Sequence, residues 1–340
     1  PGQITSMLGY LSLPDDYSTS SGLKSCWSKD STSHASSAMF TAAANAPAAG
    51  YIPTENRNYN QGFAVRKGLL MSAEPRGSFS FIIPFEHMFG FGDYNKVIYN
   101  VKHSLELTRY TSDNQGIYHA NGVADGKINL TEITWKVPHI KPDTVKLMEL
   151  RGIIESKQTI PVAFPARTSD SISVPETQNF IWRVGVTNGI EKPRWIIVAF
   201  QTNRTTTQDQ NPAVFDHLNV TSACVTLNSE KYPLHDFVTN FARNDYSELY
   251  EKFDDFKKEY YGFNSLVGGT QVNYPAFKSL FPIIVFDVRR QSESIRSGVI
   301  DMQLKFTFTN AVPADTMAYS LIISDRLYKL VSNGERLSLV

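Results

Sequence analysis

The seven histidines are the residues best able to act as bases or metal ligands near neutral pH. None of them forms a His-x-His pair, a His-Glu-x-x-His run or a cluster with cysteine, which are the spacings that zinc sites use. Glu86-His87 and Asp216-His217 are adjacent acid and base pairs, but each lacks the third group that catalysis needs. His103 lies on the apolar face of an expected strand, which is typical of a core or interface histidine. We therefore predict no enzyme activity, no catalytic residue, no cofactor and no metal site.

The charge balance and the cysteine content limit which partners and which cellular compartment we expect for this chain. Lys plus Arg and Asp plus Glu are 33 each, so no long-range field attracts nucleic acid or an anionic membrane. Cys26 and Cys224 lie far apart and give no disulfide framework, which favours a reducing compartment. No run approaches the ~18 apolar residues that a membrane span needs, so we expect no membrane span.

Length and composition predict two domains built from β-sheets. A chain of 340 residues exceeds the size at which one core usually stops growing. Hydrophobic residues make up 41% and aromatic residues 12%, and the 21 Phe and 16 Tyr favour strands. We predict an all-β chain with a few short helices, divided into an N-terminal arm (1–50), a first sandwich (51–155) and a second sandwich (156–340).

The second half contains the clearest strand patterns. Residues 300–309 alternate strictly, with Ile300, Met302, Leu304, Phe306 and Phe308 on one face, which predicts a half-buried strand. Further strands are expected at 160–164, 180–186, 194–200, 218–227, 281–288 and 319–324, with an Asn188-Gly189 turn. The spacing predicts a helix over 245–261, begun by an Asp245/Glu248 capping box and ended by Gly262. The wholly polar loop 202–212 is expected to be exposed.

The first half shows weaker strand patterns. Strands are expected at 63–65, 69–71, 77–83, 97–108 and 128–137. Within 128–137 the apolar positions slip by one residue, which predicts a β-bulge near Thr131 and Glu132. The spacing over 142–157 predicts a helix with Asp143 as N-cap, and we interpret this helix as the hinge between the two halves.

The arm, rich in serine and alanine, cannot fill a core by its composition. It is either a disordered tail or an arm that orders against a neighbouring subunit, with aromatic residues as anchors. Arg289-Arg290 forms a cationic spot at a strand end, either a loop ion pair or a contact between subunits. The candidate intersubunit contacts are Tyr17, Trp27, Phe40, Arg289 and Arg290.

Several motifs in sequence order resemble the double jelly-roll major capsid proteins of viruses. They are PFEHMFGF at 84–91, FDHLNV at 215–220, LNSEKYP at 227–233, FPIIVFDV at 281–288 and SLIISDR at 320–326. The similarity spans residues 60–331 and is strongest to the compact capsid proteins of Polinton-like and adintovirus-like elements, within the lineage of PRD1 and adenovirus.

The resemblance implies two eight-stranded jelly rolls side by side, with three chains forming a pseudo-hexagonal capsomer that tiles an icosahedral shell. The implied partners are other copies of the chain, neighbouring capsomers, and minor capsid and penton proteins. The implied location is the virion capsid, assembled inside the host cell. Because the arm lacks a block of Lys and Arg, we expect no strong direct binding of nucleic acid. The alternative is a two-domain β-sandwich that binds carbohydrate, with Tyr118 or Phe263 as sugar platforms.

Overall fold

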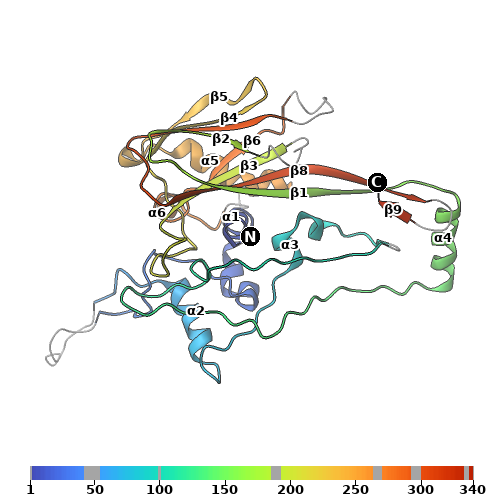
Figure 1. Ribbon diagram of the computed structural model, residues 1–340, viewed down its shortest axis with the longest axis horizontal. Coiled ribbons are helices and arrows are strands. Elements are labelled where there is room, and N and C mark those ends of the chain that lie inside the picture. The colour runs from blue at the N-terminus through green and yellow to red at the C-terminus, as the bar shows by residue number, and fades with distance from the viewer. Residues whose placement is uncertain are drawn as a thin grey trace.

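The chain forms one antiparallel β-sandwich with a long, thin extension to one side (Figure 1). The computed structural model describes residues 2–41, 54–98, 101–184, 193–262, 270–291, 300–332 and 337–339. Its strands are β1 (Ile160–Ser173), β2 (Asn179–Val184), β3 (Pro193–Thr202), β4 (Val220–Leu227), β5 (Glu230–Val238), β6 (Ile284–Asp287), β7 (Met302–Phe308), β8 (Thr316–Ser332) and β9 (Leu337–Leu339). Its α-helices are α1 (Gly2–Ser12), α2 (Gln61–Met71), α3 (Phe85–Met88), α4 (Thr144–Glu155), α5 (Ser247–Tyr261) and α6 (Tyr274–Ser279).

Two four-strand layers make the sandwich, and their order is that of a jelly roll. One sheet has the order β1-β8-β3-β6, with β9 beside β8, and the other has the order β2-β7-β4-β5. Every pairing is antiparallel. Each sheet therefore combines strands from the first part and from the last part of residues 160–339, as the wrapping of a jelly roll requires. The prediction of an all-β fold is confirmed, and so are the strands expected in the second half.

The alternation in β7 shows how sequence sets the layers. Met302, Leu304, Phe306 and Phe308 are each at most 2% exposed, whereas Lys305 between them faces solvent. Since side chains alternate across a strand, this pattern permits burial of one face only. The buried face points into the space between the sheets.

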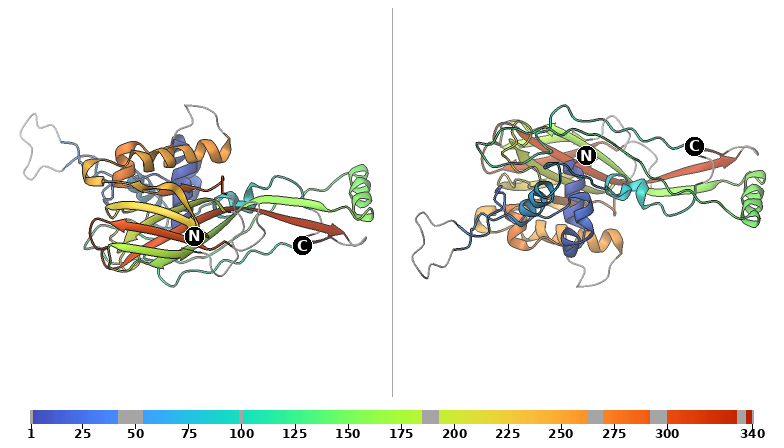
Figure 2. Two further views of the ribbon diagram at one scale, coloured as in Figure 1. Left: turned by 90° about the horizontal axis from the view of Figure 1, so that it is seen from above. Right: turned by 90° about the horizontal axis from the view of Figure 1, so that it is seen from below.

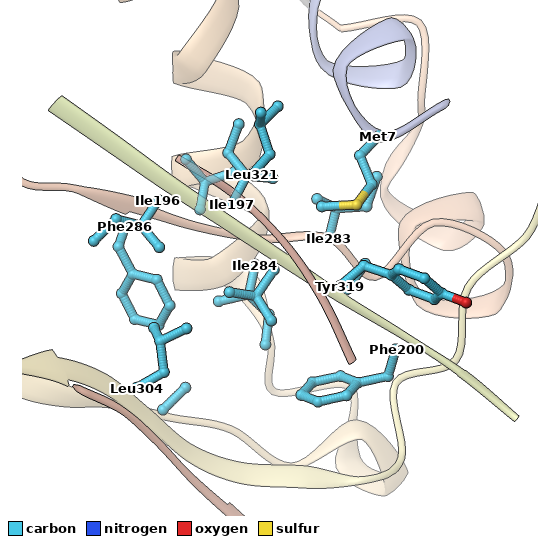
Figure 3. Packing of buried hydrophobic residues seen from close by; sticks show 14 of the residues in the cluster. Met7, Ile196, Ile197, Phe200, Ile283, Ile284, Phe286, Leu304, Tyr319 and Leu321 are labelled. Carbon is cyan, nitrogen blue, oxygen red and sulfur yellow. The ribbon is translucent and has the colours of Figure 1, made fainter. Parts of the chain in front are cut away.

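Aromatic rings fill that space. Phe306 meets Phe200 of the opposite sheet edge to face, with ring centroids 5.2 Å apart. Phe286 of β6 and Phe237 of β5 also meet between the two sheets, with ring centroids 5.6 Å apart. Figure 3 shows Phe200, Phe286 and Leu304 converging from the two sheets. Burial of such side chains contributes about 1.5–3 kcal/mol each.

Helices cover the other face of the β1-β8-β3-β6 sheet. In β3, consecutive residues from Trp195 to Phe200 are all buried, which requires a covering layer on both faces. Trp195 packs edge to face on Phe256 of α5, with centroids 5.0 Å apart. α1 contacts both α5 and β8 (Figures 1 and 2). Met7 and Leu11 of α1 are fully buried in the same core.

The burial of α1 corrects the prediction for the arm. Residues 2–12 are neither a disordered tail nor a segment ordered by a neighbour, because they complete the hydrophobic core of their own chain. The average composition of 1–50 concealed the apolar positions of this short helix. The alanine-rich residues 42–50 lie outside the described part.

The strands expected in the first half are not present among the described residues. α2 (Gln61–Met71) replaces the strands expected at 63–65 and 69–71, and its start is capped by Asn60, whose side chain accepts from the Phe63 amide. Residues 77–83, the described parts of 97–108 and 128–137 have no assigned strand. Short apolar runs do not distinguish helix from strand, and an alternating run does not specify its pairing partner.

The two predicted helices are confirmed, one with a different start. Asp143 caps α4 by accepting from the Lys146 amide at 2.8 Å, and α4 lies at the far end of the long β1–β8 ribbon (Figure 1). α5 ends at Gly262, which adopts φ +72°. Its N-cap is Tyr246 without a side-chain bond, so the predicted Asp245/Glu248 capping box is wrong. The predicted turn at Asn188-Gly189 lies outside the described residues.

Candidate assembly surface

Residues 101–141 form an extended loop that we call the open hairpin. Its arms, 101–110 and 128–141, run in opposite directions along the molecule and are joined by the tip, 111–127 (Figure 1). Arg109 fixes the arms where they meet the tip, since its Nη2 donates to Asp113 Oδ1 and to the Ile128 carbonyl, each at 2.7 Å. Asp113 Oδ2 accepts from the Ile128 amide at 3.0 Å. The bond from Arg109 and that amide lower the pKa of Asp113.

The second arm is exposed along its length. Every residue from 129 to 141 is exposed. No backbone group in this stretch bonds to the backbone of another described residue. The exposed fractions are 67% for Ile133, 41% for Trp135 and 43% for Val137. Trp135 has one neighbouring ring, Phe85 of α3, at 6.1 Å. The arm therefore presents apolar side chains and free backbone groups together.

Exposed apolar side chains are concentrated in this part of the chain. Leu107 and Tyr110 on the first arm are 53% and 62% exposed. Residues 79–83, which lead into α3, add Phe79, Phe81, Ile82 and Ile83, each at least 41% exposed. Large exposed apolar surfaces of this kind mark interaction sites in soluble proteins.

The tip is fastened to the sandwich by a buried glutamine. Gln208, only 3% exposed, accepts from the Gly126 amide at 2.8 Å and donates to the Gly126 carbonyl at 3.0 Å. The Gln208 carbonyl accepts from the His119 amide at 3.0 Å. Asn114 adds a bond to the Thr205 carbonyl at 3.0 Å. The loop 202–212 is thus partly buried, which corrects the expectation of a fully exposed loop.

A buried aspartate joins the N-terminal segment to the same loop. Asp30, 1% exposed, accepts from Arg66 of α2 at 2.6 Å and from Asn211 at 2.7 Å. The Tyr118 hydroxyl of the tip donates to the Ser33 carbonyl at 2.5 Å. A cavity of about 550 Å³ lies among these segments. The tip of the open hairpin is therefore held on two sides. The first arm also begins against the sandwich, where Val101 packs on the cluster of Val162 and Leu330.

Tyr118 is not free to act as a sugar platform. Its ring packs edge to face on Phe63, with centroids 5.5 Å apart, and its hydroxyl is bonded as described above. Burial raises its pKa to about 12. Phe263, the other aromatic residue considered for sugar binding, lies outside the described residues.

The three candidate contacts in the N-terminal segment differ in how far their side chains pack against their own chain. The hydroxyl of Tyr17 lies 3.4 Å from Nε2 of His87 in α3. Trp27 packs on Tyr10 in the core, with centroids 5.2 Å apart. Phe40 is 51% exposed, and its backbone forms an isolated β-bridge with Glu55. Of these three residues, Phe40 is the one whose side chain is largely exposed.

The two candidate arginines also differ in how far their side chains are paired with the described part of the chain. Arg289 lies over the Trp195 ring, with the guanidinium carbon 4.4 Å from its centroid. It also binds Asp287 at 2.8 Å and Glu259 of α5, so the loop ion pair considered from the sequence is present. Arg290 is exposed and forms no ion pair with the described residues. The intersubunit role of all five residues stays a prediction.

The Asp216-His217 pair takes part in local structure. Asp216 binds Arg204 and accepts from the Thr202 amide at 2.8 Å. His217 Nδ1 accepts from the Asn219 amide at 2.9 Å, and its ring stacks on Phe241 at 4.4 Å. Burial, followed by the charge of Lys278, lowers the pKa of His217.

His103 and the cysteines show no reactive environment. His103 is exposed, with Phe91 as its ring neighbour at 6.1 Å. Both cysteines are free, and burial raises the pKa of the Cys224 thiol to about 11. The described residues hold no group of three or more His, Cys, Asp or Glu that could bind a metal ion. In the same ranges, no helix has the length and hydropathy of a membrane span.

Comparisons with solved structures match the chain to viral capsid structures, among them two of PBCV-1 and one of mavirus. VP54 of PBCV-1, fitted into a cryo-EM reconstruction of the virophage Sputnik, is 9% identical over 58% of this chain and 54% of that chain, with a TM-score of 0.33. A quasi-atomic model of the PBCV-1 virus capsid is 11% identical with the same coverage and TM-score. The mavirus major capsid protein is 15% identical over 54% of this chain and 41% of that chain, with a TM-score of 0.27.

The chain spans about half the length of the first of these solved proteins, at 54%. No curated protein matches the chain. A family model described as the double jelly-roll-like domain matches residues 52–328, which is most of the sequence and includes the open hairpin and most of the sandwich. By this match, the chain belongs to the double jelly-roll-like domain family.

Proposed function

We propose that this protein is a viral major capsid protein that acts as a structural subunit without catalytic activity. In this proposal three copies form a pseudo-hexagonal capsomer, and capsomers tile an icosahedral shell. The observation that supports it most is the family match over residues 52–328, since a double jelly roll is a closed sandwich suited to building surfaces. The exposed apolar surface of the open hairpin gives a second reason, because an isolated subunit would leave it in water.

The division of the chain follows from the same proposal. Residues 156–340 supply one jelly roll, which agrees with the sandwich built from β1 to β9. Residues 51–155 supply the other jelly roll. Residues 1–50 act as an arm whose first helix is anchored in the sandwich, and exposed Phe40 and Arg290 are available for contacts between subunits.

The partners are proposed on the same basis. They are other copies of this chain, then neighbouring capsomers and minor capsid and penton proteins, within a virion assembled inside the host cell. A net charge of zero supports contacts that do not depend on a strong field, and it gives no reason to expect tight binding of nucleic acid.

Light scattering of the purified protein, with negative-stain microscopy of the same sample, tests the proposed function. A trimer or closed shells is the expected result. A monomer at every concentration would refute the capsid proposal. Binding of that monomer to a glycan array would favour the carbohydrate-binding alternative.

A further inference from the structure

The cavity beside the tip of the open hairpin has walls from segments that are distant in sequence. Residues 33–36 lie on one side with Asn56 and Asn58, the tip contributes 118–121, and the polar loop with the residues after it contributes parts of 204–216. The volume of about 550 Å³ lies within the range of ~300–1,000 Å³ that small-molecule sites use. The cavity is therefore large enough to hold a ligand.

The floor of the cavity is apolar, whereas its opening is polar. Val214 and Phe215 are each 2% exposed and line the cavity from the core. The exposed side chains at the opening form no hydrogen bond with another described residue. They are His34, Asn58, Asn121 and Gln210. Three of these four are amides, which both donate and accept hydrogen bonds. The arrangement suits a ligand that has an apolar face and an edge that donates and accepts.

The part of the loop that carries Asp209 is held in place on both sides. Gln208, 3% exposed, bonds to the tip of the open hairpin through its side-chain amide. Asn211, 2% exposed, donates to Asp30 at 2.7 Å and accepts from the Ala213 amide at 2.9 Å. Because both neighbours are fixed, this wall of the cavity keeps its position without a ligand. A preformed wall of this kind loses little conformational freedom on binding.

Asp209 supplies an acceptor that lacks a donor. Its carboxylate lines the cavity, and its Oδ1 atom is buried without a hydrogen bond from any described residue. A buried acceptor in this state lowers stability, so folded proteins retain few of them, and functional sites are among the places where they persist. A ligand hydroxyl in the cavity would supply the missing donor.

The charged side chains of the cavity argue against an anionic ligand and against a metal ion. Arg204 Nη2 donates to Asp216 Oδ1 at 3.1 Å, and His119 Nε2 lies 3.2 Å from Asp125 Oδ1. An anion would therefore meet the carboxylate of Asp209 without an unpaired Lys or Arg in the wall to balance it. Among the described residues, no group of three or more His, Cys, Asp or Glu could hold a metal ion. A neutral ligand with hydroxyl groups remains.

We propose that this cavity binds a small neutral saccharide, either free or at the end of a glycan. A sugar ring has apolar C–H faces, and each hydroxyl at its edge both donates and accepts a hydrogen bond. One face of the ring would lie on Val214 and Phe215, and one hydroxyl would donate to Asp209. The amides at the opening would bond to the remaining hydroxyls. The site needs no free aromatic ring from Tyr118, and it is independent of the proposed function because one chain forms all of it.

Saturation-transfer difference NMR of the full chain tests the site with the methyl glycosides of glucose, galactose, mannose and N-acetylglucosamine. Transfer to at least one of these neutral glycosides is the expected result. The free reducing sugars are measured in parallel, and the form that binds more tightly distinguishes a free saccharide from the end of a glycan. Absence of transfer to every neutral sugar would overturn the inference. Stronger transfer to an acidic sialoside or to putrescine would overturn it as well, because the site would then select a charge.

Three substitutions locate the binding. Asp209→Ala removes the acceptor and should raise the dissociation constant about tenfold, since hydrogen bonds to charged groups are the stronger ones. Asn121→Ala, at the exposed opening, should raise it about threefold. Asp16→Ala, exposed and outside the cavity, is the matched control and should leave it unchanged.

The position of Asn121 keeps this test independent of folding. Its side chain is exposed and bonds to no described residue, so Asn121→Ala should have the unfolding midpoint of the wild-type protein. Binding that neither Asp209→Ala nor Asn121→Ala weakens would place the saccharide elsewhere and overturn the inference. An effect of Asp16→Ala equal to that of Asn121→Ala would also overturn it.

Discussion

Met7→Ala tests whether α1 is part of the core of its own chain. Met7 is 0% exposed, and Figure 3 shows it beside Ile283 and Tyr319 in the packed cluster. Truncating a buried side chain of this size removes its transfer free energy and leaves a cavity, which costs about 2–5 kcal/mol. Since native proteins are stable by only about 5–15 kcal/mol, the variant should lose a large part of its free energy of unfolding.

Met71→Ala is the matched control, because Met71 on α2 is 55% exposed. A surface substitution of this kind changes stability by about 0.5 kcal/mol or less. Urea unfolding of both variants, followed by circular dichroism at low protein concentration, measures the difference in midpoint at constant slope. Equal midpoints for Met7→Ala and Met71→Ala would contradict the packing of α1.

The dependence on protein concentration distinguishes the two possible partners of α1. If Met7 packs within its own chain, the loss of stability is the same at all concentrations. If α1 instead ordered against a neighbouring subunit, the loss would grow as assembly became complete, because association stabilises only the bound form. A concentration-dependent loss would therefore restore the interpretation of the arm as a connection between subunits.

Three further measurements test local chemistry. Asp30→Ala leaves the guanidinium of Arg66 and the amide of Asn211 without their acceptor, so we expect the free energy of unfolding measured in urea to fall by about 1–3 kcal/mol. The control is Asp125→Ala, whose side chain is 71% exposed, and it should lower the free energy of unfolding by about 0.5 kcal/mol or less. Burial lowers the pKa of His217 below 6.5, so its contribution to stability is complete above pH 6.5 and is lost as pH falls toward the folded-state value. The difference in Tm between about pH 7.5 and about pH 5.5 should therefore shrink in His217→Gln, and an unchanged difference would contradict this. Cys224, buried with a pKa of about 11, should react with a thiol reagent far more slowly than Cys26, and equal rates would show that β4 opens readily.

The sandwich could be predicted from the sequence because its signals are local. The alternation in β7 fixes which face is buried without reference to any other segment. The end of α5 could be predicted for the same reason, since Gly262 adopts a left-handed conformation that favours glycine. β5 was missed because residues 227–233 were interpreted only as a motif, and Pro233 within the strand weakened its pattern.

The errors concern residues whose partners are distant in sequence. Gln208 belongs to a polar loop, and its burial depends on Gly126, which no local pattern connects to it. Asp30 is buried because Arg66 and Asn211 supply its bonds from two other segments. α1 was missed because serine and alanine dominate the composition of 1–50, although Met7 and Leu11 have helical spacing.

The second arm of the open hairpin is a different case, because its pattern was recognised and its partner was not. The apolar positions change face between Leu130 and Ile133, so a strand formed here would present apolar side chains on both faces. A strand of that kind needs a neighbour along its edge and covering layers above and below it. The described part of the same chain supplies Phe85 near Trp135 and little else. The alternation is a property of the segment alone, whereas a strand also depends on its partner, so the pattern could not predict the conformation of 128–137.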